Sequence, residues 1–212
     1  MDVKNFKCLN KDSLCKRLNN DRFARGMQCH LGYNYGERTR VLVVSLDCGG
    51  GGSDNIQERT NNVLANHHNP HMLGTILILK RYYQSSNEEE LLNYIAMTNS
   101  CKCCSKSSKN QMDWKYFEAC KDIKLEEILA LDPQIIFFQG KNTLAGCKFK
   151  EIDGIPIEFK DRLQMLEIEE KKFLSVKCYH PRYCNRLGRT GKENYLNLLN
   201  RIIDYLRSLN IT

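Results

Sequence analysis

The stretch RVLVVSLDCGGGGS at residues 40–53 decides the fold. Its first seven residues are almost continuously apolar and rich in β-branched side chains, which predicts a strand buried on both faces of a parallel sheet. Four consecutive glycines follow, so a ligand can approach the main chain closely at the carboxyl end of this strand, although a tight turn is the simpler explanation. The glycines match neither G-x-G-x-x-G nor a P-loop, because the P-loop lysine is missing, so the sequence disfavours a nucleotide cofactor.

Three further apolar runs, at residues 95–98, 133–140 and 173–178, predict the remaining strands of one sheet. Helical segments alternate with these strands, and we expect them at residues 54–65, 72–83, 88–94, 114–131 and 192–209. The alternation predicts a single α/β domain over residues 1–212, with three α/β/α layers and a central, mostly parallel four-stranded sheet. In such folds a ligand binds outside the carboxyl ends of the strands.

The charge balance is basic, because the chain of 212 residues carries a net charge of +7 and has a pI of about 8.8. Such a balance fits a polyanionic partner such as nucleic acid, and a basic domain without that partner is the alternative. No apolar run is long enough for a membrane span, and the start of the chain lacks the apolar core of a signal peptide. We therefore expect a monomeric, cytoplasmic protein that binds DNA and no membrane.

Eleven cysteines, an odd number in clustered positions, favour metal binding over a disulfide framework. The densest group is Cys101, Cys103 and Cys104, which comes directly after the second predicted strand and the amide side chain of Asn99. Soft thiolates at this place indicate an iron–sulfur cluster or a tetrahedral zinc site beside a ligand-reading amide. The thiolates alone do not distinguish the two metals.

Three motifs follow the first strand in order: TNSCKC at residues 98–103, AC at residues 119–120 and HPRYCNR at residues 180–186. They resemble the TNxxKC, AAC and HPSxxxR motifs of the uracil-DNA glycosylase superfamily, in particular of its iron–sulfur branch. The resemblance covers roughly residues 40–209. The chain departs from the branch at Leu46, which stands where the branch has an acid and is followed by Asp47.

The resemblance implies a DNA-repair glycosylase that flips uracil or a related damaged base out of DNA and hydrolyses its N-glycosidic bond. His180 would donate a hydrogen bond to the carbonyl oxygen of the leaving base, where negative charge develops. Asp47 would position water or stabilise the oxocarbenium-like sugar. As a purely structural residue, His180 would be a loop histidine before a proline-fixed turn.

The base pocket implied by the resemblance has four members. Asn99 would present its amide to the Watson–Crick edge of the base, because one carboxamide offers a donor and an acceptor together. His71 would stack beneath the base, and the backbones of Gly49 and Gly50 would approach it closely. Without the resemblance, Asn99 is as readily a turn residue and His71 a solvated loop residue.

The metal ligands implied by the resemblance are Cys8, Cys15, Cys103 and Cys120. Residues 1–36 are then an N-terminal segment that supplies two of these ligands to a 4Fe-4S cluster, with zinc as the alternative metal. Cys101 or Cys104 lies close enough along the chain to replace Cys103, and Cys29 can replace an N-terminal ligand.

Basic residues gather after the last predicted strand, at Arg182, Arg186, Arg189 and Lys192. We expect them to contact DNA phosphates, with Leu187 as a wedge that enters the vacated base stack. Two other functions remain open. One is a non-catalytic nucleic-acid-binding protein that keeps the fold and has lost the acid at Leu46, and the other is a cluster-bearing structural protein without a base pocket.

Overall fold

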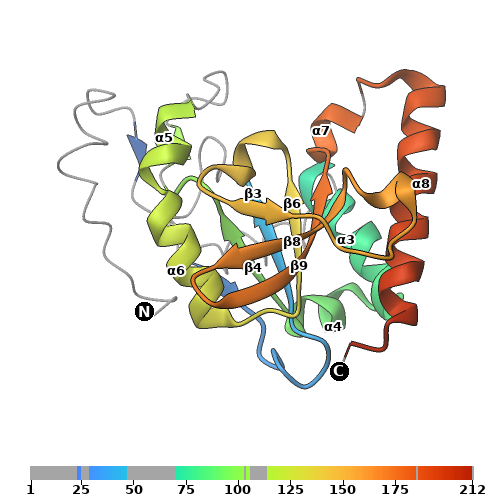
Figure 1. Cartoon of the computed structure of the whole chain (residues 1–212), viewed down its shortest axis with the longest axis horizontal. Helices are drawn as coiled ribbons and strands as arrows, with labels where there is room; N and C mark the ends of the chain where they lie inside the picture. The colour runs from blue at the N-terminus through green and yellow to red at the C-terminus, as the bar shows by residue number, and fades with distance from the viewer. Residues whose placement is uncertain are drawn as a thin grey trace.

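The computed structural model describes residues 23–24, 29–46, 70–102, 104–105, 114–184 and 186–211. Its centre is an open seven-stranded mixed sheet (Figure 1). In the order in which they lie side by side, the strands are β2 (His30–Leu31), β4 (Ile95–Asn99), β3 (Val41–Ser45), β6 (Ile135–Gln139), β9 (Lys171–Cys178), β8 (Leu163–Ile168) and β7 (Lys148–Lys150). A separate antiparallel pair joins β1 (Phe23–Ala24) to β5 (Cys104–Ser105).

The four strands predicted from apolar runs are confirmed as β3, β4, β6 and β9, and they pair in parallel. The predicted size of the sheet is wrong, because three antiparallel strands extend it to seven. β2 pairs with β4 at one edge, and the hairpin β8–β9 carries β7 at the other edge. These strands carry a weak apolar signal because they are short or alternate with polar residues, as in the KFK sequence of β7.

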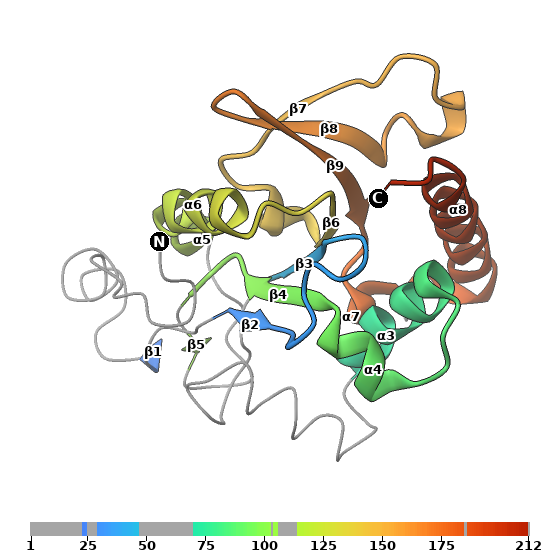
Figure 2. The same ribbon diagram turned by 90° about the horizontal axis from the view of Figure 1, so that it is seen from below.

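Helices cover both faces of the sheet (Figure 2). They are α3 (Pro70–Tyr83), α4 (Glu88–Asn93), α5 (Trp114–Ala119), α6 (Lys121–Leu131), α7 (Pro181–Cys184) and α8 (Gly188–Ser208), with short 3-10 turns η2 (Lys141–Leu144) and η3 (Ile157–Phe159). The single helix predicted for residues 114–131 is therefore two helices, α5 and α6, separated at Cys120. The terminal helix begins earlier than predicted, at Gly188. Among the described residues no helix is both long and apolar enough to cross a bilayer.

Alternation along each central strand sends neighbouring side chains to opposite layers. Val41 and Val43 belong to the cluster that α3, α4 and α8 complete, whereas Leu42 and Val44 belong to the cluster that contains Ile128 of α6. All four strand residues are fully buried. Each such side chain contributes about 1.5–3 kcal/mol to folding, so the central strands hold the three layers together.

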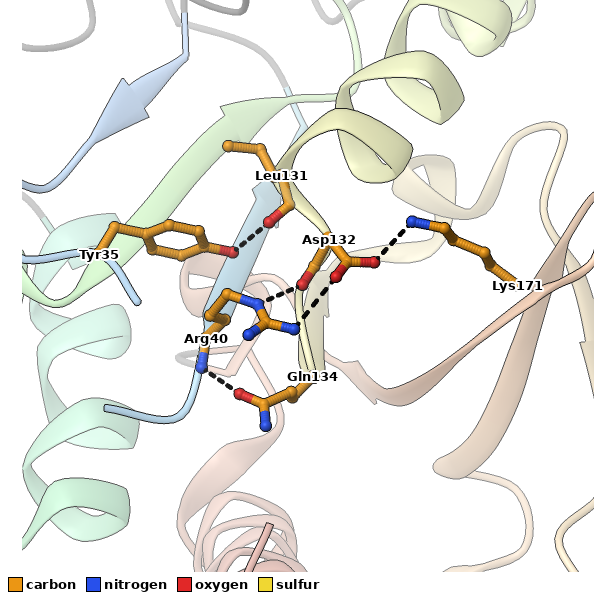
Figure 3. Close-up of polar contacts among 6 residues, drawn as sticks. All are labelled: Tyr35, Arg40, Leu131, Asp132, Gln134 and Lys171. Carbon is orange, nitrogen blue, oxygen red and sulfur yellow. Dashed lines mark hydrogen bonds and ion pairs between the residues drawn. The ribbon is translucent and has the colours of Figure 1, made fainter. Parts of the chain in front are cut away.

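A polar cluster closes the amino ends of β3 and β6 (Figure 3). The Arg40 guanidinium donates to the Asp132 backbone carbonyl at 2.6 Å, and it forms an ion pair with the Asp132 carboxylate at 3.1 Å. Lys171 approaches the same carboxylate at 2.9 Å. The Tyr35 hydroxyl donates to the Leu131 carbonyl at the end of α6. These contacts fix the turn between α6 and β6, at the edge of the sheet opposite the carboxyl ends.

Candidate functional site at the carboxyl edge of the sheet

The parallel strands β3, β4, β6 and β9 all end at one edge of the sheet, at Ser45, Asn99, Gln139 and Cys178. β3 lies in the middle, and the chain passes from β4 on one side of it to β6 on the other. The order of the strands therefore reverses between β3 and β6. In open α/β sheets this switch point is where ligands bind.

Four buried polar side chains, three from strand ends and one from α3, lie at this edge on the face covered by α3. The Ser45 hydroxyl donates to Gln139 Oε1 at 3.4 Å, and Gln139 Nε2 donates to Thr75 Oγ1 of α3 at 2.9 Å. Asn99 is the direct neighbour of Ser45 in the β3–β4 register, so its side chain lies on the same face. Asn99 is only 5% exposed. The edge thus presents a row of amides and hydroxyls where the apolar core ends.

The ends of β3, β6 and β9 meet at Gly140. Its φ is +110°, a conformation that favours glycine. A Cβ atom at this position would lie 3.2 Å from Leu46 Cδ2 and 3.3 Å from the Cβ atom of His180. Glycine at residue 140 therefore lets the segment carrying His180 come close to the end of β3.

A backbone hydrogen bond orients the His180 ring. Its Nδ1 atom accepts from the Arg182 N–H at 3.2 Å, so in the neutral ring the proton is on Nε2. The His180 carbonyl accepts from the N–H groups of Tyr183 and Cys184, which begins α7. Pro181 packs directly against Gly74 of α3, where a Cβ atom would lie 2.7 Å from the proline ring. The histidine is therefore held between β9, α7 and α3.

Aromatic side chains support this segment from behind. The Tyr179 N–H donates to the Tyr195 hydroxyl at 3.0 Å, and the Arg162 guanidinium lies 4.0 Å from the centre of the Tyr179 ring. Burial raises the pKa of Tyr195, so its phenol stays neutral. Tyr183 makes an edge contact with Tyr179 at 5.4 Å between ring centroids and is itself 49% exposed.

Two buried thiols lie on the opposite face, behind the end of β4. Cys101 and Cys120 belong to one cluster with Tyr116, Phe117 and Ala145, and neither cysteine is accessible to solvent. A hydrogen bond from the Cys101 side chain, with a backbone hydrogen bond and the positive charge of Lys102, lowers the pKa of Cys120 to about 7 against the opposing effects of burial and Glu127. A thiol that ionises this readily is suited to bind a soft metal.

A buried ion pair lies beside these thiols. Lys102 Nζ bonds both the Glu127 carboxylate of α6 and the Thr98 hydroxyl, and the same hydroxyl donates to Glu127 Oε2 at 2.6 Å. Both charged side chains are 0% exposed. The sequence prediction did not identify Glu127, because a single glutamate in an amphipathic helix carries no signal that it faces inward.

The arginines predicted to contact DNA lie on and after α7. Arg182, Arg186 and Arg189 are exposed, and Arg189 pairs with Glu193 at 3.2 Å. Leu187 is partly buried and packs against the core cluster between the sheet and α8. The exposed apolar side chain in this segment is Tyr183, which the sequence prediction did not single out.

Several predicted site residues fall outside the described ranges, namely Asp47, Gly49, Gly50, Cys8, Cys15 and Cys103. His71 lies in the first turn of α3, where only the backbone is described. The structure brings Asn99, His180 and Gly140 to one edge of the sheet, and it places Cys101 against Cys120. No group of three or more candidate metal ligands occurs among the residues that the structure describes.

Comparison with known proteins adds no relative to this picture, since neither a scan of protein-family models nor a search of curated proteins matched the chain.

Proposed function

We propose that the protein is a DNA glycosylase that extrudes uracil or a related deaminated base and hydrolyses its N-glycosidic bond. The observation that carries the proposal is that Asn99 and His180 lie at the same carboxyl edge of the sheet, on either side of the switch point between β3 and β6. An amide and an imidazole there are the two kinds of group that read a base and stabilise it as it leaves.

The proposed reaction assigns separate steps to these two side chains. Asn99 offers a carbonyl acceptor and an N–H donor to the imide edge of the extruded base, and so selects it. Water attacks C1′ of the sugar as the bond from C1′ to the base nitrogen breaks, and the bonding electrons leave with the base. His180 Nε2–H stabilises the negative charge that develops on the base oxygen. Asp47, which follows Leu46 and lies outside the described residues, is the proposed carboxylate that orients the water and accepts its proton.

The thiol pair supports the second part of the proposal, a metal site beside the base pocket. The soft donors and the lowered pKa of Cys120 fit a 4Fe-4S cluster or a zinc ion. Cys8, Cys15 and either Cys103 or Cys101 would complete the ligand set with Cys120. A metal bound there would link the junction of α5 and α6 to the segment after β4.

The surface around α7 supports DNA as the partner. Arg182 and Arg186 are exposed there and can neutralise phosphates. Tyr183 stands between them with half of its surface accessible, and an aromatic ring among arginines can stack on a base. This surface adjoins His180, so a strand bound to it would pass the proposed catalytic edge.

Release of free base from an oligonucleotide tests the proposal. Single-turnover reactions with a panel of deaminated bases, in single and double strands, should give release of at least one base by wild-type protein. Asn99→Ala should reduce both the rate and the selectivity among the bases. Asn197→Ala, the same change on the exposed face of α8, is the matched control and should retain both. A wild-type protein that releases no base from any substrate would overturn the proposal.

One observation favours a second candidate, a non-catalytic nucleic-acid-binding protein of the same fold. The apolar side chain of Leu46 follows directly on β3 and packs against the buried cysteine cluster. The position directly after the strand therefore offers no carboxylate. Salt-dependent DNA binding without base release would select this candidate.

A further inference from the structure

Asn99, the candidate for reading the base, lies in a segment whose two ends, Thr98 and Lys102, both bond to the buried carboxylate of Glu127 of α6. Between these two ends, the Ser100 N–H donates to the Ser45 carbonyl at 2.7 Å. The segment from Thr98 to Lys102 is thereby held by α6 on one face and by the backbone of β3 at its side.

Because side chains alternate along β4, the contact between Thr98 and Glu127 and the side chain of Asn99 lie on opposite faces of the sheet. Thr98 points to the α6 face, where Glu127 accepts its hydroxyl, and the next residue, Asn99, points to the α3 face with Ser45 and Gln139. A shift of Lys102 or Glu127 therefore moves the backbone of the segment and changes where the Asn99 amide lies. The ion pair itself does not reach the face on which a base would bind.

This network is a costly means of stabilising a fold. Removing two charges from water carries a desolvation penalty that a buried ion pair often fails to offset. Of the described side chains, Ser100 Oγ and Glu127 Oε1 are the buried polar atoms without a hydrogen-bond partner, and both belong to this region. Apolar residues of similar volume would carry neither the desolvation penalty of the pair nor the cost of the unpaired oxygen at Glu127.

We propose that Lys102 and Glu127 are positioning residues that set the location of the Asn99 amide, and with it the selectivity among bases. The proposal rests on the proposed base-reading role of Asn99. The hydroxyl of Thr98 is the link, because it accepts from Lys102 and donates to Glu127 next to Asn99. Lys102 and Glu127 touch no substrate and act only through the segment between Thr98 and Lys102.

The chain supplies a matched control in Lys124, a second buried lysine on α6. Its ammonium group donates to the Thr143 carbonyl at 2.8 Å and to the Ala145 carbonyl, and so holds the turn after β6. Lys124→Met removes the same charge from the same layer, and it leaves the bonds of Thr98 and Lys102 to Glu127 in place. An effect of Lys102→Met that Lys124→Met reproduces would come from general loss of packing.

The test uses the whole chain labelled with nitrogen-15 at asparagine. The side-chain amide signals of Asn99 are identified by their loss in Asn99→Ala. We expect them to shift in Lys102→Met and in the charge-neutral double variant with Glu127→Leu, and to stay in place in Lys124→Met. The double variant keeps the measurement interpretable, because replacing both partners leaves no unpaired charge. Thr98→Val, which removes only the linking hydroxyl, should shift the same signals.

Base selectivity is the second readout. In the Lys102→Met and double variants the ratio of single-turnover rates for the best and second-best base should fall roughly ten- to hundredfold, the usual effect of a small misplacement at a catalytic site. Asn99 signals that stay in place in every variant of the ion pair would overturn the proposal. Shifted signals in a protein that releases no base would uphold the positioning role and defeat only the proposed reaction.

Discussion

The Nδ1 atom of His180 accepts a hydrogen bond from the backbone N–H of Arg182 at 3.2 Å. An imidazole that accepts at Nδ1 and is neutral carries its proton on Nε2, so the ring is prepared to donate a hydrogen bond from that atom. The donor is a backbone group at the start of α7, and therefore every substitution at residue 182 except proline keeps it. This separation allows the roles of the ring and of the neighbouring arginine to be measured independently.

His180→Ala should lower the single-turnover rate of base release roughly 10²- to 10³-fold, the usual effect of losing one donor to a developing oxyanion. The affinity for DNA should change little, because the contact strengthens only as charge develops on the leaving base. Arg182→Ala keeps the N–H that orients the ring and should weaken DNA binding without a comparable loss of rate. Equal losses of rate in the two variants would contradict this assignment.

Arg186→Ala should reduce the slope of log Kd against log salt by about one, because one fewer counterion is released on binding DNA. Arg201 is the control, since it carries the same charge on α8 and pairs with Glu158 of η3. Arg201→Ala should leave the slope unchanged. A titration of labelled DNA at several salt concentrations measures both values, and an unchanged slope for Arg186→Ala would place the DNA elsewhere.

Tyr183 and Leu187 should respond in opposite ways to truncation, because one is half exposed and the other packs on the core. Tyr183→Ala should weaken DNA binding by about 1–3 kcal/mol, the cost of a lost base-stacking contact, and should leave the unfolding free energy nearly unchanged. Leu187→Ala should instead reduce the unfolding free energy by about 2 kcal/mol, the low end of the range for leucine truncation, because Leu187 is only partly buried. Loss of DNA affinity without loss of stability in Leu187→Ala would instead support the sequence-based prediction that Leu187 is the wedge.

Anaerobically purified protein should be brown and absorb broadly in the visible range, from an iron–sulfur cluster that includes Cys120. Cys120→Ser should abolish the colour and the bound metal. Comparison of Cys101→Ser with Cys103→Ser decides which thiol after β4 is the ligand, because only the ligand's replacement removes metal. Metal analysis by mass spectrometry distinguishes the outcomes, and a colourless protein with stoichiometric zinc would exclude the cluster.

Asp132→Asn should weaken the polar cluster at the amino ends of β3 and β6 in a pH-dependent way (Figure 3). Lys171, with a smaller contribution from Arg40, lowers the pKa of the Asp132 carboxyl below its ordinary value of 3.8. The carboxylate therefore stabilises the fold above that ordinary value, and its contribution disappears as pH falls through the lowered pKa.

Because Asp132 is half exposed, solvent screening limits the expected loss in Asp132→Asn to about 0.5–1 kcal/mol at neutral pH. Asparagine tolerates the left-handed backbone at this position, where φ is 45°, so the substitution isolates the charge. Chemical denaturation of both proteins at several pH values measures the difference. A loss that persisted at strongly acidic pH would assign the effect to the backbone instead.

The local sequence pattern determined the strands β3, β4, β6 and β9, because runs of apolar, β-branched residues specify strands buried on both faces. It also placed Asn99 and His180 at one edge, because parallel strands share the side on which they end. The three antiparallel strands β2, β7 and β8 escaped prediction. β2 is two residues long and pairs with β4, which is distant in the sequence, whereas β7 and β8 pair with the strands that follow them and mix apolar with polar residues.

Only the tertiary structure decided which side chains meet on the two faces of the sheet at that carboxyl edge. Lys102 reaches Glu127 because α6 crosses the end of β4 with that glutamate turned inward, and Ser45 meets Gln139 because the register of β3 and β6 brings the two strand ends level. Cys101 lies against Cys120 for the same reason, since α5 ends where β4 ends. Helix rotation and strand register are set by packing across the whole domain, and no short stretch of sequence encodes them.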